Sequence, residues 1–162
     1  MRGYFAIGAE NISKSMNLGA LLRTANAFGA SFTFTIGSSL DWRSIQQSDT
    51  SHAVEHCPVY KWKSIDDMDL PIGCQLVGVE LVDRAINLPS FRHPQRAAYI
   101  LGPEKGNLSG EILAKCHHIV RIPTDFCINL SLAGALVMYD RMISLGRFAE
   151  RPVRAGGQQI RK

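Results

Sequence analysis

The chain has 162 residues, 46% of them hydrophobic, which is enough for one compact domain with an ordinary core. Its formal charge of +4 permits an anionic partner such as nucleic acid without requiring one. The four cysteines form no CxxC pair, which argues against a zinc knuckle and a disulfide framework. Neither a signal peptide nor an apolar run near the roughly 20 residues of a membrane span is found, so we expect a soluble, cytoplasmic protein without a membrane anchor.

The first part of the chain has the pattern of a strand, a helix and a second strand. Residues 4–7 form a short apolar run, and the loop after them leads into a segment with helical periodicity. Gly29 is a natural end for that helix, and alternating phenylalanine and threonine at 32–36 then predict a strand. The apolar face of the helix consists of Leu18, Leu21, Leu22, Ala25 and Phe28.

The middle of the chain is less regular. Asp41 can cap a helix over residues 42–47, whereas the segment 55–62 looks extended and contains a proline that keeps it out of a sheet centre. Residues 75–81 have the pattern of an apolar strand. We interpret residues 83–96 as a loop, because two prolines interrupt any regular element there.

The remaining elements alternate between strand and helix. Residues 97–101 are a continuous apolar run, followed by a helical pattern at 109–116, a strand at 119–122 and a long helix at 130–147. This alternation predicts an α/β fold around a mostly parallel sheet. Residues 148–162 are rich in arginine and poor in apolar residues, so we interpret them as a flexible basic tail, either without a task or able to contact RNA.

The first segment with possible chemistry is NLGALLRTA, residues 17–25. Asn17 can cap the helix, and Gly19 permits close approach of another backbone. Arg23 lies roughly 140° around the helix from Leu18, so it should face away from the core. There it is free to bind a phosphate or, alternatively, to pair with a nearby acid in solvent.

The second segment is ILGPEKGNLS, residues 100–109, in which a buried strand opens through a glycine-bounded turn into a helix. Open α/β folds bind ligands at the carboxyl ends of such strands. The pattern is neither GxGxxG nor GxxxxGK[ST], so it indicates neither NAD nor ATP. The alternative is a structural turn in which glycine supplies a positive φ.

The third segment is IPTDFCINLSLAGALVMYDR, residues 122–141, in which Asn129 and Ser131 open the long helix. Polar groups at a helix start can bind the polar parts of a ligand. Asn129 has this possible role, or it is simply the N-cap.

Together, the three segments resemble the motifs of the SpoU, or TrmH-like, branch of the SPOUT RNA methyltransferases. The resemblance spans nearly the whole chain and is greatest to the short, TrmL-type members. The matching residues are Asn17, Gly19, Arg23, Thr24 and Ala25 in the first motif, Gly102, Glu104 and Gly106 in the second, and Ile122, Pro123, Asn129 and Ser131 in the third.

The resemblance implies a methyltransferase domain over residues 1–147 with a deep C-terminal trefoil knot, and a homodimer that places the arginine motif of one subunit near the cofactor loops of the other. It implies methylation of a ribose 2′-hydroxyl of RNA, of tRNA more than rRNA, with S-adenosylmethionine as the cofactor and no metal. The implied catalytic residues are Arg23, Asn17, Glu104 and Asn129. The implied cofactor-binding residues are Leu101, Gly102, Pro103, Glu104, Gly106, Ile122, Pro123, Leu130 and Ser131.

The role of Arg23 leaves two possibilities open. The family proposal makes this arginine the general base, yet a guanidinium is effectively always protonated. We favour Arg23 as a phosphate anchor that also stabilises the developing alkoxide.

The sequence departs from the family pattern at Cys127, where serine is usual, and in a shorter loop before Asn129. The alternative function is therefore an RNA-binding module of the same fold without catalysis. A more remote alternative is a metal enzyme that uses His52 and His56, which have the i, i+4 spacing of a helical ligand pair.

Overall fold

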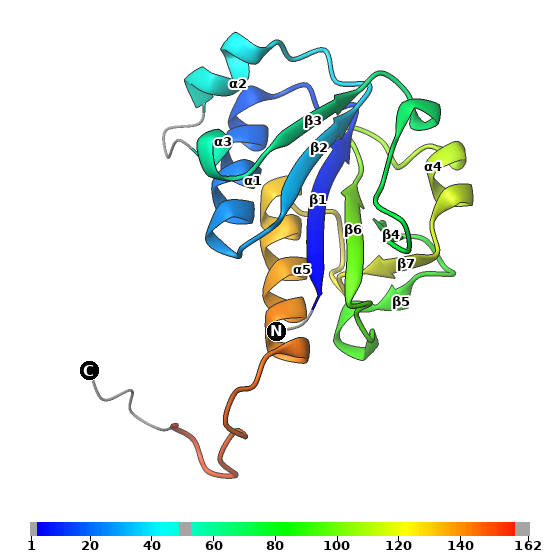
Figure 1. Ribbon diagram of the computed structural model, residues 1–162. Coiled ribbons are helices and arrows are strands. Elements are labelled where there is room, and N and C mark those ends of the chain that lie inside the picture. The colour runs from blue at the N-terminus through cyan, green and yellow to red at the C-terminus, as the bar shows by residue number, and fades with distance from the viewer. Residues whose placement is uncertain (1–2, 49–52, 158–162) are drawn as a thin grey trace.

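The computed structural model describes residues 3–48 and 53–157. Within these ranges seven strands form one sheet in the order β3-β2-β1-β6-β4-β7-β5, and every neighbouring pair is parallel (Figure 1). The strands are β1 (Tyr4–Glu10), β2 (Phe32–Ile36), β3 (Val59–Trp62), β4 (Gln75–Val79), β5 (Ile86–Asn87), β6 (Arg96–Leu101) and β7 (His118–Arg121).

Helices pack on both faces of the sheet, which confirms the predicted α/β class (Figure 1). Four of them share one apolar cluster with one face: α1 (Ser15–Ala27), α2 (Trp42–Ser48), α3 (Ala53–His56) and α5 (Leu130–Leu145). On the opposite face, α4 (Gly110–Lys115) packs through Ile112 over Ala98 and Ile100. Two 3-10 turns, η1 (Ile65–Asp67) and η2 (Leu88–Ser90), lie in the connections. The trefoil knot stays a prediction.

Most predicted elements are present, but two segments differ from their predictions. Residues 55–62 are extended only in part, because Glu55 and His56 belong to α3. Asp41 caps α2, since its Oδ1 accepts a hydrogen bond from the Ser44 backbone N–H at 2.7 Å. β3 lies at the edge of the sheet, as the proline before it predicts. Residues 83–96 are not simply a loop, because they contain β5 and η2. β5 has only two residues and depends on its pairing with β7, so no local pattern announces it.

The α1–α5 layer follows from side-chain size. Leu18, Leu21 and Leu22 of α1 are buried, as the periodicity predicts. A Cβ at Gly134 of α5 would lie 2.6 Å from Leu21 Cδ1, so the glycine allows α5 to approach α1 closely. Gly19 does the same for α2, because a Cβ there would lie 2.4 Å from the Ser48 carbonyl oxygen.

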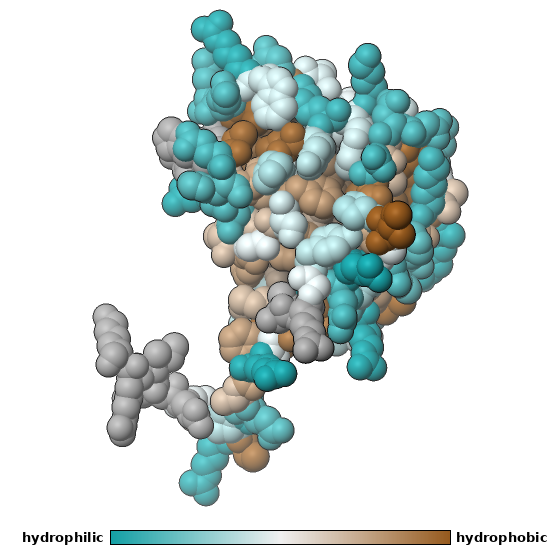
Figure 2. Space-filling model, viewed as in Figure 1, coloured by the Kyte–Doolittle hydropathy of each residue, from teal (hydrophilic) through white to brown (hydrophobic). Residues whose placement is uncertain are grey.

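The described part of the tail, residues 148–157, has no helix or strand and projects from the body of the domain (Figure 2). Among the residues that the structure describes, no helix is long and apolar enough to span a membrane.

A buried polar network lies near the amino-terminal ends of β1 and β6. Its central residues are His93, Tyr99 and Arg141, which are nearly inaccessible to solvent. The Tyr99 hydroxyl lies 2.6 Å from His93 Nδ1, and His93 Nε2 lies 2.8 Å from Asp140 Oδ2. Since a carboxylate only accepts, Nε2–H donates to Asp140 and Nδ1 accepts the Tyr99 O–H. Burial lowers the pKa of His93, and the neighbouring carboxylate of Asp140 only partly opposes this. The imidazole is therefore neutral near pH 7.

We expect the free energy of unfolding to decrease as the pH falls below about 6.5, the pKa of an ordinary histidine. Below that pH the unfolded chain binds a proton that the folded His93 resists, so protons favour unfolding; above it the stability is fully present. Urea unfolding at pH 7.5 and pH 5 measures this. His93→Gln should weaken the dependence, whereas the exposed control His56→Gln should not, and equal profiles for the two would contradict the prediction.

Candidate functional site

The site lies at the carboxyl edge of the sheet, where four parallel strands end in one row. Ala9 of β1 pairs with Leu101 of β6, Leu101 pairs with Val79 of β4, and Val79 pairs with Val120 of β7. The segments that follow these strands consequently emerge side by side, at the edge where open α/β sheets bind ligands.

A pocket of about 330 Å³ opens at this edge, a size typical of small-molecule sites. It brings together nine of the predicted site residues: Asn17, Leu101, Gly102, Pro103, Glu104, Gly106, Ile122, Asn129 and Leu130. The sequence reasoning missed the other lining residues: Lys14, Val79, Glu80, Leu81, Thr124, Cys127, Ile128 and Ala133. The three motifs therefore share one cavity.

A chain of side-chain hydrogen bonds connects the three motifs directly. Asn17 Nδ2 donates to Glu104 Oε1 at 3.3 Å, and Asn129 Nδ2 donates to Asn17 Oδ1 at 3.1 Å. The side-chain amide of Asn17 thus connects the loop at Glu104, 87 residues later in the chain, to the start of α5 at Asn129, 112 residues later. This arrangement holds both sides of the pocket at a fixed spacing.

Glu104 also fixes the chain just before α1. The N-cap of α1 is Lys14, so the prediction that Asn17 caps this helix was wrong. The Glu104 carboxylate instead accepts the backbone N–H groups of Ser13 at 3.2 Å and Lys14 at 3.0 Å. No local sequence signal could show this, because the acceptor comes from the loop after β6.

Glu104 is ionised at neutral pH. Burial disfavours its charged form, but hydrogen bonds from its own backbone N–H, from Lys14 and Ser13, and from Asn17 outweigh burial and lower its pKa. A fixed negative charge therefore stands at the pocket wall, which suits a ligand that carries positive charge.

Asn129 combines the two roles that its sequence position left open. Its Oδ1 caps α5 by accepting the Ser131 backbone N–H at 2.9 Å and the Ser131 hydroxyl at 2.6 Å. Its Nδ2 is then directed to Asn17, so a single side chain caps the helix and completes the pocket wall.

The glycine-bounded turn is shaped by two different requirements. Gly106 has a φ of 95°, a conformation that disfavours any residue with a side chain. At Gly102 the limit is space, because a Cβ would lie 3.2 Å from both Glu80 Oε2 and the Leu108 backbone nitrogen. The turn is thus structural and also lines the pocket.

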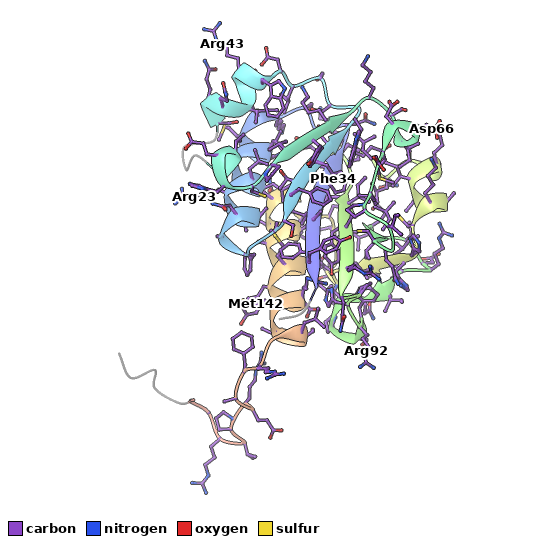
Figure 3. The ribbon with its side chains drawn as sticks, viewed as in Figure 1. Arg23, Phe34, Arg43, Asp66, Arg92 and Met142 are labelled. Atoms are coloured by element: carbon purple, nitrogen blue, oxygen red, sulfur yellow. The ribbon has the colours of Figure 1, made fainter. Side chains whose placement is uncertain are left out.

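Three predicted site residues do not line the pocket. Pro123 is exposed between two lining residues, and Ser131 is held on Asn129. Arg23 is exposed on the outer side of α1 and points away from the sheet, as its helical position predicts (Figure 3). Within one chain, the arginine and the pocket therefore remain apart.

The described residues offer no cluster of metal ligands. Over residues 3–48 and 53–157, no group of three or more histidine, cysteine, aspartate or glutamate side chains is placed to hold a metal ion. His52, half of the alternative ligand pair, lies outside the described residues.

Comparison with known proteins identifies the family. The sequence profile of the SpoU rRNA Methylase family matches residues 4–139, which is most of the chain. The chain belongs to the SpoU family. Residues from all three SpoU motifs line the pocket described above: Asn17, Gly102, Glu104, Gly106, Ile122 and Asn129.

This chain spans only part of the length of the curated relatives that it matches. The chain is 24% identical over 137 residues to a tRNA (guanosine(18)-2′-O)-methyltransferase of Escherichia coli K12, covering 81% of this chain and 59% of the relative. It is 27% identical over 142 residues to the mouse tRNA (guanosine(18)-2′-O)-methyltransferase TARBP1, covering 82% of this chain but 9% of the relative.

Solved structures confirm the fold. An AdoMet-bound rRNA methyltransferase from Sinorhizobium meliloti superposes with a TM-score of 0.79 at 20% identity, covering 91% of this chain and 59% of that one. The SpoU chain thus has the same arrangement of sheet and helices.

Proposed function

We propose that this protein transfers a methyl group from S-adenosylmethionine to a ribose 2′-hydroxyl of RNA. The observation that carries the proposal is the hydrogen-bonded chain from Glu104 through Asn17 to Asn129, which unites three SpoU motifs around one pocket. The names of the curated relatives favour tRNA over rRNA. A cytoplasmic location and a contribution of the basic tail to RNA affinity stay predictions.

The pocket suits S-adenosylmethionine in size, polarity and charge. Leu101, Ile122 and Leu130 supply an apolar wall for an adenine, and the turn between Gly102 and Gly106 supplies backbone groups close to the ligand. The ionised Glu104 suits the positive charges of the donor. When bound, the cofactor supplies a methyl group on a sulfonium, a group that a ribose oxygen can attack.

The residues around the pocket position the reaction and stabilise charge. We propose that Asn17, Glu104 and Asn129 fix the shape of the pocket. Arg23 binds an RNA phosphate and stabilises the negative charge that develops on the ribose oxygen while the hydroxyl proton passes to water. Arg23 can do this only if it comes from a second copy, because it is exposed on the outer face of α1 and does not line the pocket of its own chain (Figure 3).

An exposed apolar stripe on α5 and an exposed methionine on α1 support a homodimer. Leu132, Leu136 and Tyr139 of α5 are 60%, 44% and 47% exposed, at the spacing of one helix face. On α1, Met16 is 81% exposed and lies on the same outer face as Arg23, two turns along the helix. Since α1 and α5 pack side by side, a second copy that covers the α5 stripe and Met16 would also bury the surroundings of Arg23.

The test of the proposed function combines cofactor binding with product mapping. We expect the purified protein to bind S-adenosylmethionine in calorimetry and to form 2′-O-methyl groups on tRNA. Asn129→Asp keeps the α5 cap but loses the donor to Asn17, so methylation should fall at least about tenfold with little change in melting temperature. Asn26→Asp on α1 is the matched control. RNA binding without any cofactor affinity would instead identify a non-catalytic RNA-binding module.

A further inference from the structure

Glu80 is a buried carboxylate at the pocket that none of the three sequence motifs includes. It follows β4 directly, is only 9% exposed and lines the pocket. Its backbone N–H donates to the Val120 carbonyl at 2.9 Å, so the sheet ladder continues through this residue and fixes where its side chain begins.

Both carboxylate oxygens of Glu80 accept one backbone N–H. Oε1 accepts from Leu81 at 2.8 Å, and Oε2 accepts from Leu108 at 2.7 Å. A carboxylate has about four acceptor positions, so each oxygen keeps capacity for a further donor. No lysine, arginine or histidine among the described residues forms an ion pair with Glu80. Because a buried charge requires compensation, the site favours additional hydrogen-bond donors from a ligand.

The position of Glu80 relative to the glycine turn defines which ligand group it can meet. Val79 of β4 pairs with Leu101 of β6, so Glu80 and Gly102 directly follow two adjacent strands. The backbones of adjacent strands lie roughly 4.8 Å apart. The carboxylate lies beside the Gly102 backbone, where a Cβ would come within 3.2 Å of Oε2. In dinucleotide-binding folds, an acidic residue beyond the glycine turn accepts the ribose hydroxyls of the bound nucleoside.

We propose that Glu80 binds the ribose hydroxyls of the nucleoside cofactor and thereby selects a ribonucleoside over a deoxyribonucleoside. This assignment rests on the proposed function. The two hydroxyls donate to Oε1 and Oε2, while the N–H groups of Leu81 and Leu108 hold the carboxylate in place. Glu80 is thus a cofactor-binding residue, and it links recognition of the ribose to the conformation of the glycine turn.

A buried carboxylate with a purely structural role provides the matched control. Glu10 is the last residue of β1 and is 6% exposed. Its Oε2 accepts the Ser109 backbone N–H at 2.8 Å. It therefore holds the residue next to Leu108, but it does not line the pocket. Loss of either carboxylate disturbs the same turn, whereas only loss of Glu80 removes the proposed ribose contact.

The experiment measures binding of S-adenosylhomocysteine and of its 2′-deoxy and 3′-deoxy analogues by calorimetry. For the wild-type protein we expect at least one analogue to bind about tenfold or more weakly than the parent, since a buried carboxylate would lose its donor. Glu80→Gln should weaken the parent about tenfold and reduce the discrimination to about twofold. Glu10→Gln should keep the wild-type discrimination, whatever its overall affinity.

Each outcome bears on a separate claim. If Glu80→Gln discriminates among the compounds as well as the wild type does, the assignment is overturned. It is also overturned if the wild type binds all three compounds equally. That second measurement uses the wild-type protein alone and does not depend on the folding of any variant. In both cases cofactor binding itself stands. If the wild type binds none of the compounds, the proposed function fails and the Glu80 assignment fails with it.

Discussion

Arg23→Ala is expected to reduce methyl transfer to RNA at least about 100-fold, the usual effect of removing a donor that stabilises transition-state charge. Affinity for S-adenosylmethionine should stay within about twofold of the wild type, because Arg23 does not line the pocket of its own chain. Arg23→Lys keeps the charge but loses the planar fork that binds phosphate, so an intermediate loss is expected. Single-turnover methylation and calorimetry measure the two quantities, and undiminished turnover would remove Arg23 from the mechanism.

Mixed dimers distinguish an arginine supplied by the partner from one that acts within its own chain. Arg23→Ala retains an intact pocket, whereas Gly102→Val retains the arginine but forces a side chain against Glu80. If the site is shared, a mixed dimer combines one good pocket with one good arginine. A random mixture of these two inactive variants should then recover about a quarter of the wild-type activity, since half of the dimers carry one intact site. No recovery, with mixed dimers demonstrated, would place both groups in one chain.

The sequence predicted the local parts of the site better than their connections. The period of Leu18, Leu21 and Leu22 located α1 and turned Arg23 outward, because a helix face depends only on spacing. The cap of α1 was misassigned to Asn17; the N-cap is Lys14, whose backbone N–H donates to Glu104, a contact that no neighbouring residue signals. Such long-range contacts depend on the strand order, which the alternation of elements leaves undetermined.

Glu80 shows the same limit at the pocket. The sequence placed Glu80 inside a predicted strand over residues 75–81, whereas β4 ends at Val79, so no local pattern showed that this acid follows the strand and lines a pocket. The register that sets β4 beside β6 gives Glu80 its neighbours Gly102 and Leu108. The pocket residues outside the three motifs could not be predicted from the sequence, because only the register of the sheet brings them together.

Arg141→Met is expected to cause the largest loss of stability, about 3–5 kcal/mol, as when one partner of a buried charged network is removed. The guanidinium is 1% exposed and donates to the carbonyls of Pro94, Gln95 and Tyr4, at 2.6, 2.8 and 3.3 Å. It also lies 5.3 Å from the Phe5 ring, within the range of a cation–π contact. Without it, the carbonyls of Pro94 and Tyr4 lose this donor, the Gln95 carbonyl keeps only the Tyr4 backbone N–H, and α5 loses its hydrogen bonds to the starts of β1 and β6.

This effect should be separable from the chemistry of the site. Arg141 acts near the amino-terminal ends of β1 and β6, whereas the pocket lies at their carboxyl ends, so the folded fraction of Arg141→Met should still bind S-adenosylmethionine. Arg92→Met, which removes an exposed arginine from the loop beside the network, is the control and should change stability by less than about 0.5 kcal/mol. Urea unfolding compares the two variants. Equal stabilities would mean that the guanidinium network contributes little, and that apolar packing of Val137 and Met138 alone holds α5 on the sheet.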